Sequence, residues 1–428
     1  MAVKYTEEQL NSVDKSFFIQ LLLQQQEQLE AEFGVKGWKQ LPDAISRKYH
    51  FVPAKVEVEE HHIGVYAGKR DEHMVKADHP KALLHGSLVS PSLGAAIING
   101  KYVNAVPFYR LEQEFQRYGL QITRQNMANW YIRLAEEYLA ILYDHFHKKL
   151  YFYHVIQADE TPVLVNHDGR KSWMWVYRSG HLYQKRQIVL YEYQQTRNAS
   201  HPREFLKGYD GICVTDGYQV YHTLEKELEE LTIAGCWVHC RRRFDEALKL
   251  IPKSYQKESH AFLLMKQIQA IYREEGKLND LSSDERLKQR QAVIKPLVDA
   301  FFAYLKTINV SKKDKFGDAV GYARNQEKYL RVFLTDGDVP IDNNASERAI
   351  RGFCIGKNWQ MIDTIHGAKS SAIIYSIVET AKANNLKPFD YVQHLLEEMP
   401  KHMDDRDCSF LENLLPWSEK LPAGIRKA

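Results

Sequence analysis

The stretch from His154 to Val165, HVIQADETPVLV, constrains the fold more than any other part of this chain. Its first four residues read as the start of a strand, and the acidic pair Asp159 and Glu160 follows. An unpaired charge at the end of a buried strand is costly, and chains tolerate one where it holds a metal or takes part in a reaction. The same pattern also fits an acid in a surface turn, so the downstream sequence has to distinguish the two interpretations.

Composition narrows the class of protein. A chain of 428 residues can hold about two to four domains, and 44% hydrophobic with 26% charged residues is usual for a soluble globular protein. The net charge of +3 means that any basic surface must be local. The longest apolar run near the start, Phe17 to Leu23, is too short to span a bilayer and lacks the flanks of a signal peptide. We therefore expect a cytoplasmic protein.

The cysteines do not form a disulfide framework or a zinc ribbon, because their number is odd and no CxxC pair occurs. The five are Cys213, Cys236, Cys240, Cys354 and Cys408. Cys236, His239 and Cys240 lie together in GCWVHCRRRF and could supply three zinc ligands, but no second ligand pair is near in sequence. We interpret Cys236 as the end of a buried strand and the residues after it as the start of a helix.

The first 150 residues predict two helical regions around a strand-like one. Residues 5–32 form a predicted helix, a short coiled-coil remnant, and 49–66 alternates like a strand. Residues 81–150 return to a helical pattern, broken at Gly119, with Thr123 as the N-cap of the next helix. This helix pair is either a helix-turn-helix or an ordinary helical hairpin. In the first case the residues that face DNA are Arg124, Gln125, Asn126 and Asn129.

After residue 150 the predicted order is three strands, then a helix and a strand, then another helix and strand. The strands are 154–165, 173–177, 187–193, 211–215 and 231–238, and the helices are 200–206, capped by Ser200, and 221–230. This is the order of a ribonuclease-H-like fold, an α+β architecture whose first and fourth strands are neighbours. Asp159 comes from the first strand and Asp216 from the end of the fourth, so we expect the two carboxylates to lie close together.

Two neighbouring carboxylates suit two-metal phosphoryl transfer, in which a pair of Mg²⁺ ions activates the attacking hydroxyl and stabilises the leaving oxygen. A third carboxylate, from a helix, would complete such a site. Residues 250–335 read as charged helices, which we interpret as an insertion. Glu347 follows them near the start of a predicted helix, where the helix dipole favours its ionised form. The candidate caps of that helix are Asn343, Asn344 and Ser346.

Glu347 alone also fits an acid in the capping turn of a solvated helix. Basic and aromatic residues around it favour a functional interpretation, since they suit phosphate contacts and base stacking. They are Arg348, Arg351, Lys357 and Trp359.

Several motifs in this order resemble the transposase of the insertion-sequence-sixty-six family, TnpC type. They are ADETPV, TDGYQVY, GCWVHCRRRF, IDNNASERAIR, GKNW, SIVETAKANNL and LLPW, and the match runs from the region of residue 45 to the C-terminus. The resemblance implies a DDE triad in a ribonuclease-H-like domain that is interrupted by an insertion. It assigns catalysis and the binding of two Mg²⁺ ions, or of Mn²⁺ in their place, to Asp159, Asp216 and Glu347.

The resemblance further implies DNA strand cleavage and strand transfer at the inverted-repeat ends of an insertion sequence, into a target DNA. A homo-oligomer on DNA, a nucleoid-associated location and accessory proteins of the same element are family-level expectations. The DNA-binding residues are then Arg348, Arg351, Lys357, Trp359, Arg241, Arg242, Arg124 and Asn126. Two alternatives stay open: a catalytically idle DNA-binding remnant, and a ribonuclease-H-like nuclease without strand transfer. A glycosidase would also use paired acids, but it would not explain the basic patch.

The sequence departs from the family at its N-terminal side. Family members carry a longer coiled coil and a four-cysteine zinc ribbon, whereas here the coiled coil stops near Glu32 and VYAGKRDE stands in place of the second cysteine pair. We therefore expect no structural zinc. The predicted division is 1–33, a short helix; 34–80, a β-rich degenerate zinc-ribbon-like segment; 81–150, a helix-turn-helix-like region; 151–250 with 331–385, the catalytic domain; 251–330, the helical insertion; and 386–428, a C-terminal helical tail.

Overall fold

The computed structural model describes residues 15–33, 46, 48, 55–67, 73–78, 81–166, 169, 171–310, 314–356 and 362–427. The chain divides into two units, Met1–Val58 and Glu59–Ala428. In the first unit the described helix is α2 (Lys15–Phe33), and the part of the predicted helix before Lys15 lies outside the described residues. In the second, β1 (Val65–Ala67) pairs antiparallel with β2 (Met74–Lys76). The strand predicted over 49–66 is therefore wrong for residues 55–64, which form no strand.

The predicted helix pair around Gly119 is present. The helices before the sheet are α3 (Pro91–Ile98), α4 (Phe108–Arg117), α5 (Arg124–Leu134) and α6 (Ala140–Leu150), with π-helical turns at Asn99–Val103 and Ala135–Leu139. Gly119, between α4 and α5, has a φ of +83°, a conformation that glycine adopts without steric cost. The Thr123 hydroxyl accepts a hydrogen bond from the Asn126 backbone amide, which confirms Thr123 as the N-cap of α5. DNA reading by this pair stays a prediction.

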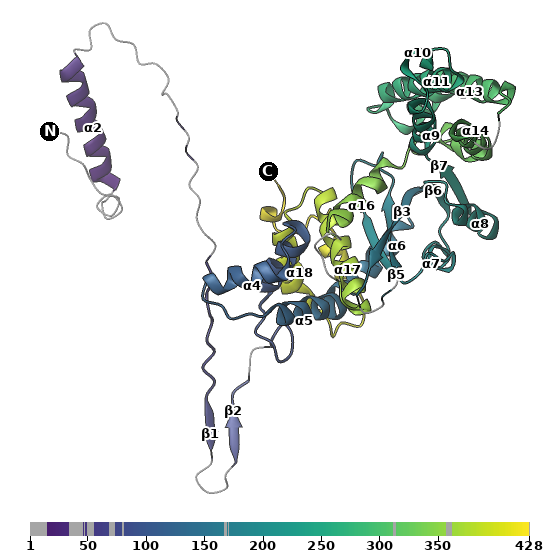
Figure 1. Cartoon of the computed structure of the whole chain (residues 1–428). Helices are drawn as coiled ribbons and strands as arrows, with labels where there is room; N and C mark the ends of the chain where they lie inside the picture. The colour runs from purple at the N-terminus through teal and green to yellow at the C-terminus, as the bar shows by residue number, and fades with distance from the viewer. Residues whose placement is uncertain are drawn as a thin grey trace. The chain divides into compact units, whose positions relative to one another are not determined.

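A mixed five-stranded sheet forms the centre of the second unit (Figure 1). Its strands are β3 (Val155–Leu164), β4 (Lys171–Ser179), β5 (Val189–Gln194), β6 (Gly211–Thr215) and β7 (Leu231–Gly235), in the spatial order β5-β4-β3-β6-β7. The first three strands form an antiparallel meander, and β6 and β7 run parallel to β3. The predicted strands are confirmed, including the pairing of the first with the fourth.

Two local predictions are wrong. The fifth strand was expected to reach Val238, but it ends at Gly235, because α9 begins at Trp237. Ser200 does not cap α7 (Ser200–Phe205): it is the first residue of that helix, Ala199 occupies the N-cap, and no side-chain capping bond forms. The Ser200 amide instead donates to Oδ1 of Asn198, which fixes the turn before the helix.

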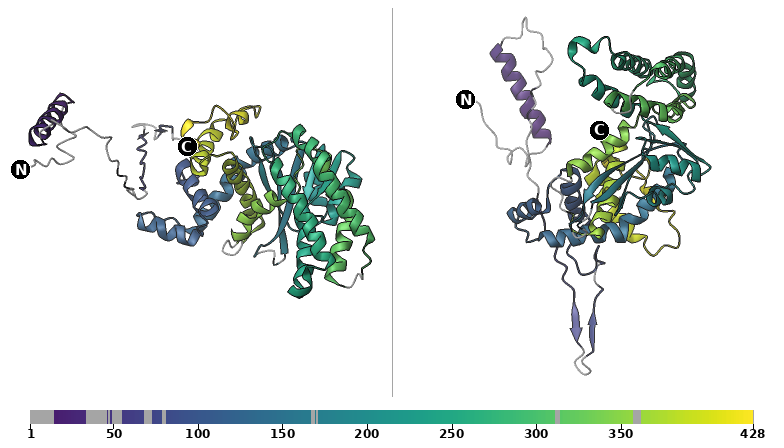
Figure 2. Two further views of the ribbon diagram at one scale, coloured as in Figure 1. Left: turned by 90° about the horizontal axis from the view of Figure 1, so that it is seen from above. Right: turned by 45° about the vertical axis from the view of Figure 1, so that its right-hand side comes forward.

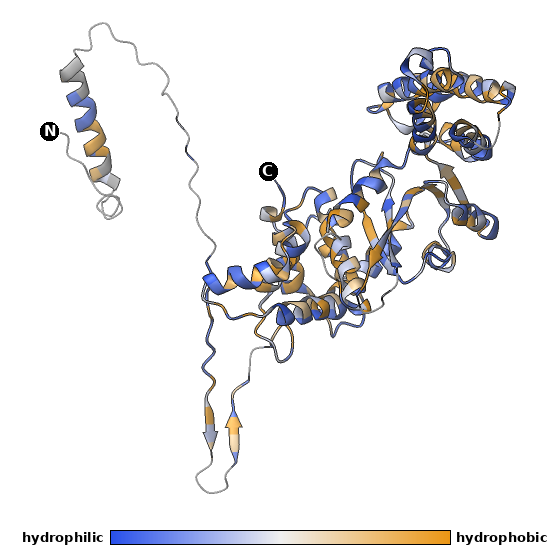
Figure 3. Cartoon of the chain, viewed as in Figure 1, coloured by the Kyte–Doolittle hydropathy of each residue, from blue (hydrophilic) through white to orange (hydrophobic). Residues whose placement is uncertain are grey.

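Both faces of the sheet are buried, as expected for strands that read as continuous apolar runs. Cys213 of β6 packs into a core on one face, whereas its neighbours Ile212 and Val214 pack into a separate core on the other. Figure 2 shows helices on both sides of the sheet, and in Figure 3 much of the hydrophobic colour lies on the central strands.

The helices after β6 complete the two layers. They are α8 (Gln219–Glu227), α9 (Trp237–Lys249), α10 (Lys253–Gln256), α11 (His260–Glu275), α12 (Ser283–Gln289), α13 (Lys295–Thr307), α14 (Lys315–Asn325), α15 (Glu327–Leu330), α16 (Asn344–Gly356), α17 (Ile365–Ala383), α18 (Pro388–Glu398) and α19 (Leu411–Leu414). Shorter turns lie at Gly276–Leu278, Arg290–Ile294, Val332–Leu334, Met399–Lys401 and Ala423–Ile425. The helices predicted over 250–335 are present, and α11 and α13 bury apolar residues such as Ile268 and Phe301. Where the structure is described, no helix is both long and apolar enough to cross a bilayer.

Helix α17 covers the free edge of the sheet at β5. The backbone amides of Val189 and Tyr191 donate to the hydroxyls of Thr380 and Ser376, at 3.0 and 2.7 Å. These hydroxyls are four residues apart on one face of α17, so they match alternate residues of the strand. The edge amides are thus satisfied inside the chain, which prevents this edge from pairing with another strand.

Glu192, on the same edge strand, makes stability depend on pH. Burial raises the pKa of its carboxyl from an ordinary 4.5 to about 7. The folded chain therefore favours the protonated form, and its stability falls as pH rises between these two values. We expect Glu192→Gln to leave stability unchanged below pH 4 and to raise it by about 2–3 kcal/mol at pH 7 to 8. Denaturant unfolding of both proteins across pH would show this, and parallel curves would contradict it.

Candidate active site

Two aspartates lie at equivalent positions on adjacent strands. Gln157 of β3 pairs with Val214 of β6 at the last parallel pair between these strands. Asp159 and Asp216 each lie two residues beyond that pair. An even step in a strand returns a side chain to the same face, and the two strands run parallel, so the carboxylates emerge at the same level. The expected approach of Asp159 and Asp216 follows from this register.

The third acid reaches the site because α16 is tied to β3. Asn343, directly before α16, is fully buried, and its Nδ2 donates to the Ala158 carbonyl oxygen at 2.7 Å. The Gln157 side chain donates to Oδ1 of Asn343 at 3.1 Å. Asn343 therefore joins helix to strand through its side chain instead of capping the helix, and Asp342 accepts from the Asn344 amide. Glu347 consequently stands in the first turn of α16, as predicted.

The charges of the three acids act on one another. Burial raises the pKa of Asp159 to about 8, and the carboxylates of Glu160, Asp216 and Glu347 add to the increase. Burial and repulsion from the neighbouring carboxylates keep a proton on Asp159. A bound divalent cation would offset this repulsion and so stabilise the ionised carboxyl. The donors are oxygen atoms, which Mg²⁺ prefers. The residues therefore fit a divalent metal ion.

Glu160 is a fourth buried acid beside the site. Burial raises its pKa to about 7, and the Asp216 charge contributes, while Arg197 opposes the shift. Arg197 donates through Nε to Glu160 Oε1 at 2.9 Å, and its guanidinium lies 3.7 Å from the centre of the Tyr218 ring. The Tyr218 amide in turn donates to Oδ1 of Asp216 at 2.8 Å. Sequence reasoning missed Arg197, because no local pattern links it to residues 160 and 216.

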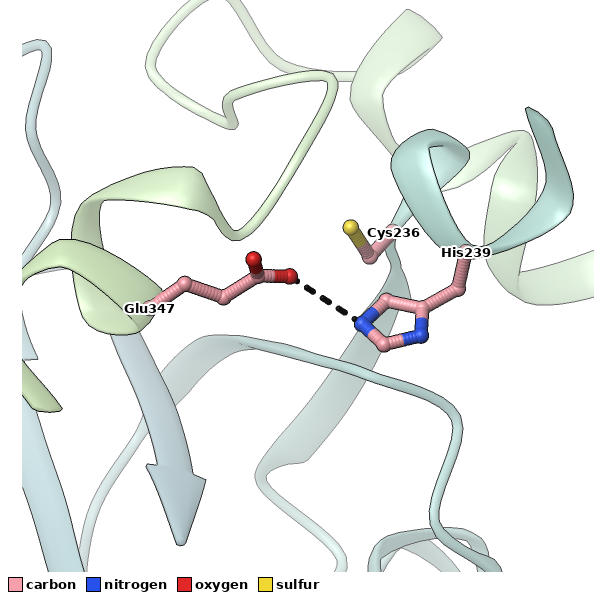
Figure 4. Close-up of side chains that lie close together, drawn as sticks. All are labelled: Cys236, His239 and Glu347. Atoms are coloured by element: carbon pink, nitrogen blue, oxygen red, sulfur yellow. Dashed lines mark hydrogen bonds and ion pairs between the residues drawn. The ribbon is translucent and has the colours of Figure 1, made fainter. Parts of the chain in front are cut away.

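Glu347 pairs with basic side chains of α9. Its Oε1 lies 3.2 Å from Nε2 of His239 (Figure 4). Its Oε2 lies 3.7 Å from the guanidinium of Arg242. The hydrogen bond with His239 is the main reason that the pKa of Glu347 is lowered. The sequence had presented His239 only as a zinc candidate together with Cys236 and Cys240. In the structure, Cys236, His239 and Glu347 form the cluster, and their ligand atoms lie within 4.8 Å of one another.

The predicted DNA-binding residues fall into two groups. Arg241 and Arg242 are exposed on α9, and Arg348 and Arg351 are exposed on α16. Of these, Arg242 lies 3.7 Å from Glu347, and the charges of Arg242 and Arg351 help to lower the pKa of that carboxyl. Lys357 and Trp359 lie outside the described residues. The second group, Arg124 and Asn126, is exposed in the first turn of α5, a helix that packs on α3, α4 and α17. The structure therefore brings Arg242 and Arg351 near Glu347 and places Arg124 and Asn126 on a different helix, and DNA binding by any of these residues stays a prediction.

The position of Glu347 depends on Asn343. We expect Asn343→Ala to lower the free energy of unfolding by about 1–3 kcal/mol, because the Ala158 carbonyl oxygen and the Gln157 amide would lose their buried partner. Asn344→Ala, at the half-buried next residue, is the matched control and should cost less than half as much. Denaturant unfolding measures both. Equal losses would show that the side-chain bridge to β3 does not stabilise the fold.

A mixed sheet with a carboxylate cluster just beyond the point where two parallel strands stop pairing, with an arginine beside it, defines a site for an anionic substrate and a cation. Comparison with known families gives the class. A family model described as "Transposase IS66 family" matches residues 86–370, and one described as "IS66 C-terminal element" matches 376–417. The chain belongs to the IS66 family of transposases, as the motifs predicted. Membership implies a DNA-binding, DNA-processing enzyme.

The chain is also similar to individual proteins over most of its length. The uncharacterized protein y4qI of Sinorhizobium fredii is 30% identical over 391 residues, which cover 88% of this chain and 71% of y4qI. The uncharacterized protein y4jD of the same organism is 25% identical over 394 residues, or 88% of this chain and 76% of y4jD. Their names state no activity, so the reaction has to be argued from the site.

Proposed function

We propose that this chain is a DDE transposase with a ribonuclease-H-like catalytic domain, which cleaves and joins DNA at the ends of an insertion sequence. The observation that carries the proposal is the register of β3 and β6, which sets Asp159 and Asp216 at one level on neighbouring strands. Family membership supports the substrate, and the arginines of α9 and α16 supply a surface for its phosphates.

Each acid has a separate role in this proposal. Asp159 and Asp216 would hold the divalent metal ions, and Glu347, in the first turn of α16, would add a ligand. When bound, a pair of such ions activates the attacking water or 3′-hydroxyl and stabilises the leaving oxygen. Mg²⁺ is the expected ion, because the three donors are carboxylates. Asn343 fixes α16 against β3, so it orients Glu347 toward the aspartates.

The other polar groups prepare the site. Arg197 neutralises Glu160, so the excess negative charge is left on the three ligands. Tyr218 orients the Asp216 carboxylate through its backbone amide. The exposed arginines next to Glu347 bind the phosphates on both sides of the scissile phosphate. These contacts place the scissile phosphate over the three acids.

The test is strand joining in vitro. A plasmid that carries the native DNA flanking the coding sequence supplies the element ends, and a second plasmid supplies the target, with Mg²⁺ present. Joined products from the wild type would support a transposase. DNA ends that are cut but not joined would favour a ribonuclease-H-like nuclease, and binding without cleavage would favour an idle remnant. Either of the last two results would contradict the proposal.

The basic patch gives a separate prediction on binding. Arg348 is exposed one residue after Glu347, so we expect it to contact a phosphate. Arg348→Ala should weaken binding to DNA of any sequence and reduce the slope of log K against log salt by about 0.9, the value for one phosphate contact. Filter binding from low to moderate salt measures the slope. Arg203→Ala, which removes an arginine paired with Glu227, is the control. Identical slopes for Arg348→Ala and wild type would remove Arg348 from the interface.

A further inference from the structure

Cys236, His239 and Glu347 converge on one point beside the carboxylates. Cys236 follows β7 directly and occupies the N-cap of α9, and His239 lies one helical turn later. Glu347 enters from the first turn of α16. Figure 4 shows the thiol, the imidazole and the carboxylate turned toward one another, and their ligand atoms lie within 4.8 Å of one another.

The three donors form a set that suits zinc-like ions and not magnesium. Thiolate sulfur and imidazole nitrogen bind borderline-soft ions such as Zn²⁺, whereas Mg²⁺ takes oxygen ligands. Bond lengths of about 2.0–2.2 Å to nitrogen and oxygen place these atoms roughly 3.3–3.5 Å apart in a tetrahedral zinc site. The observed separation of His239 Nε2 and Glu347 Oε1 is 3.2 Å. An ion can therefore enter with a small adjustment.

The surroundings also resemble a built site. Cys236 is buried, and the Asn343 backbone amide donates to its sulfur at 3.2 Å, a contact that favours a metal-bound thiolate. The side chains of His239 and Glu347 are 24% and 23% exposed, so solvent reaches the cluster from one side. An ion, and a water molecule as its fourth ligand, would reach the cluster through these partly exposed side chains. Cys240, the expected sequence partner, is instead buried in the core on the α9 face of the sheet.

We propose that Cys236, His239 and Glu347 bind an exchangeable transition metal ion of the zinc type, and that this ion inhibits DNA cleavage by holding Glu347 away from Asp159 and Asp216. Binding displaces the thiol proton to solvent and leaves the oxidation state of every group unchanged. The binding part is independent of the proposed function, and the inhibition part rests on it. The proposed site is not part of a zinc ribbon. The expectation that the protein holds no structural zinc therefore changes only for this cluster of three residues.

Cobalt(II) titration tests the binding part. Metal-free full-length protein should bind one equivalent of Co²⁺ with a thiolate-to-cobalt charge-transfer band in the near ultraviolet. Cys236→Ala should abolish the band, and the matched Cys240→Ala should keep it. His239→Gln, at a half-buried position, retains the Cys236 thiol but removes a ligand. It should weaken Co²⁺ binding by about 100-fold, because loss of a ligand costs at least as much as loss of an outer-shell partner. No band in the wild type, or an equal band in Cys236→Ala, would overturn the site.

Zinc inhibition tests the second part. The rate of Mg²⁺-dependent cleavage with and without equimolar Zn²⁺ is compared within each variant, so differences in basal rate cancel. The wild type should lose at least about 90% of its rate, and Cys236→Ala, which lacks the thiolate ligand, should lose far less. If the wild type shows the cobalt band but Zn²⁺ inhibits both proteins equally, the inhibition part of the proposal is refuted and the binding part stands. If no protein cleaves DNA, the inhibition fails with the proposed function, while the band still decides the site.

Discussion

Asp216→Asn is expected to lower metal-dependent DNA cleavage by at least about a thousandfold, equal to about 4 kcal/mol of transition-state stabilisation. The amide keeps the size of the side chain but loses the charge that a divalent ion needs. The fold should persist, because the Asp216 charge raises the pKa of Asp159 and its removal relieves repulsion. Asp159→Asn should give the same loss for the same reason. Cleavage of end-labelled DNA under single-turnover conditions measures both.

Asp210→Asn is the matched control. Asp210 is exposed and directly precedes β6, so it lies at the opposite end of the strand that leads to Asp216. The substitution is chemically identical, and we expect wild-type cleavage from it. Thermal unfolding should show all three variants folded, with Asp216→Asn as stable as the wild type or more so. Wild-type cleavage by Asp216→Asn would remove this residue from the site.

Glu347→Gln is expected to reduce cleavage and strand joining together, each by about a hundredfold or more. Cleavage and joining use the same metal ligands, so we expect the rates of both steps to fall by the same factor. Stability should change little, since the pairs that Glu347 makes with His239 and Arg242 are partly exposed. Quantified cleavage and joining products from one reaction series measure the two steps.

Glu192→Gln makes the same chemical change on β5, where the carboxyl faces no predicted ligand. It should cleave and join DNA at wild-type rates while gaining stability at neutral pH. A Glu347→Gln protein that joins DNA as fast as the wild type would exclude Glu347 as a metal ligand. Loss of joining with normal cleavage would assign it to capture of the target DNA instead.

The sequence by itself determined the elements that depend on local pattern. Apolar runs followed by an acid marked β3 and β6, because a strand buried on both faces is apolar. β6 ends directly before Asp216, whereas β3 continues past Asp159 to Leu164. The order of strands and helices then predicted that β3 and β6 are neighbours, which the sheet confirms. Thr123 was recognisable as a cap, since its hydroxyl bonds to an amide only three residues away. Such short-range interactions leave a signature in the sequence.

Only the tertiary structure decided which side chains meet. Asn343 was expected as a cap, yet it bridges to Ala158, and a buried carbonyl oxygen without a strand partner is the physical reason. His239 was grouped with Cys236 and Cys240 by sequence distance. The structure keeps Cys236 beside it, but the third member is Glu347, 108 residues later, in place of Cys240. Arg197 lies in the connection between β5 and α7, and it neutralises Glu160 of β3. These contacts join segments that the chain brings together only when both cores are packed, so no local spacing encodes them.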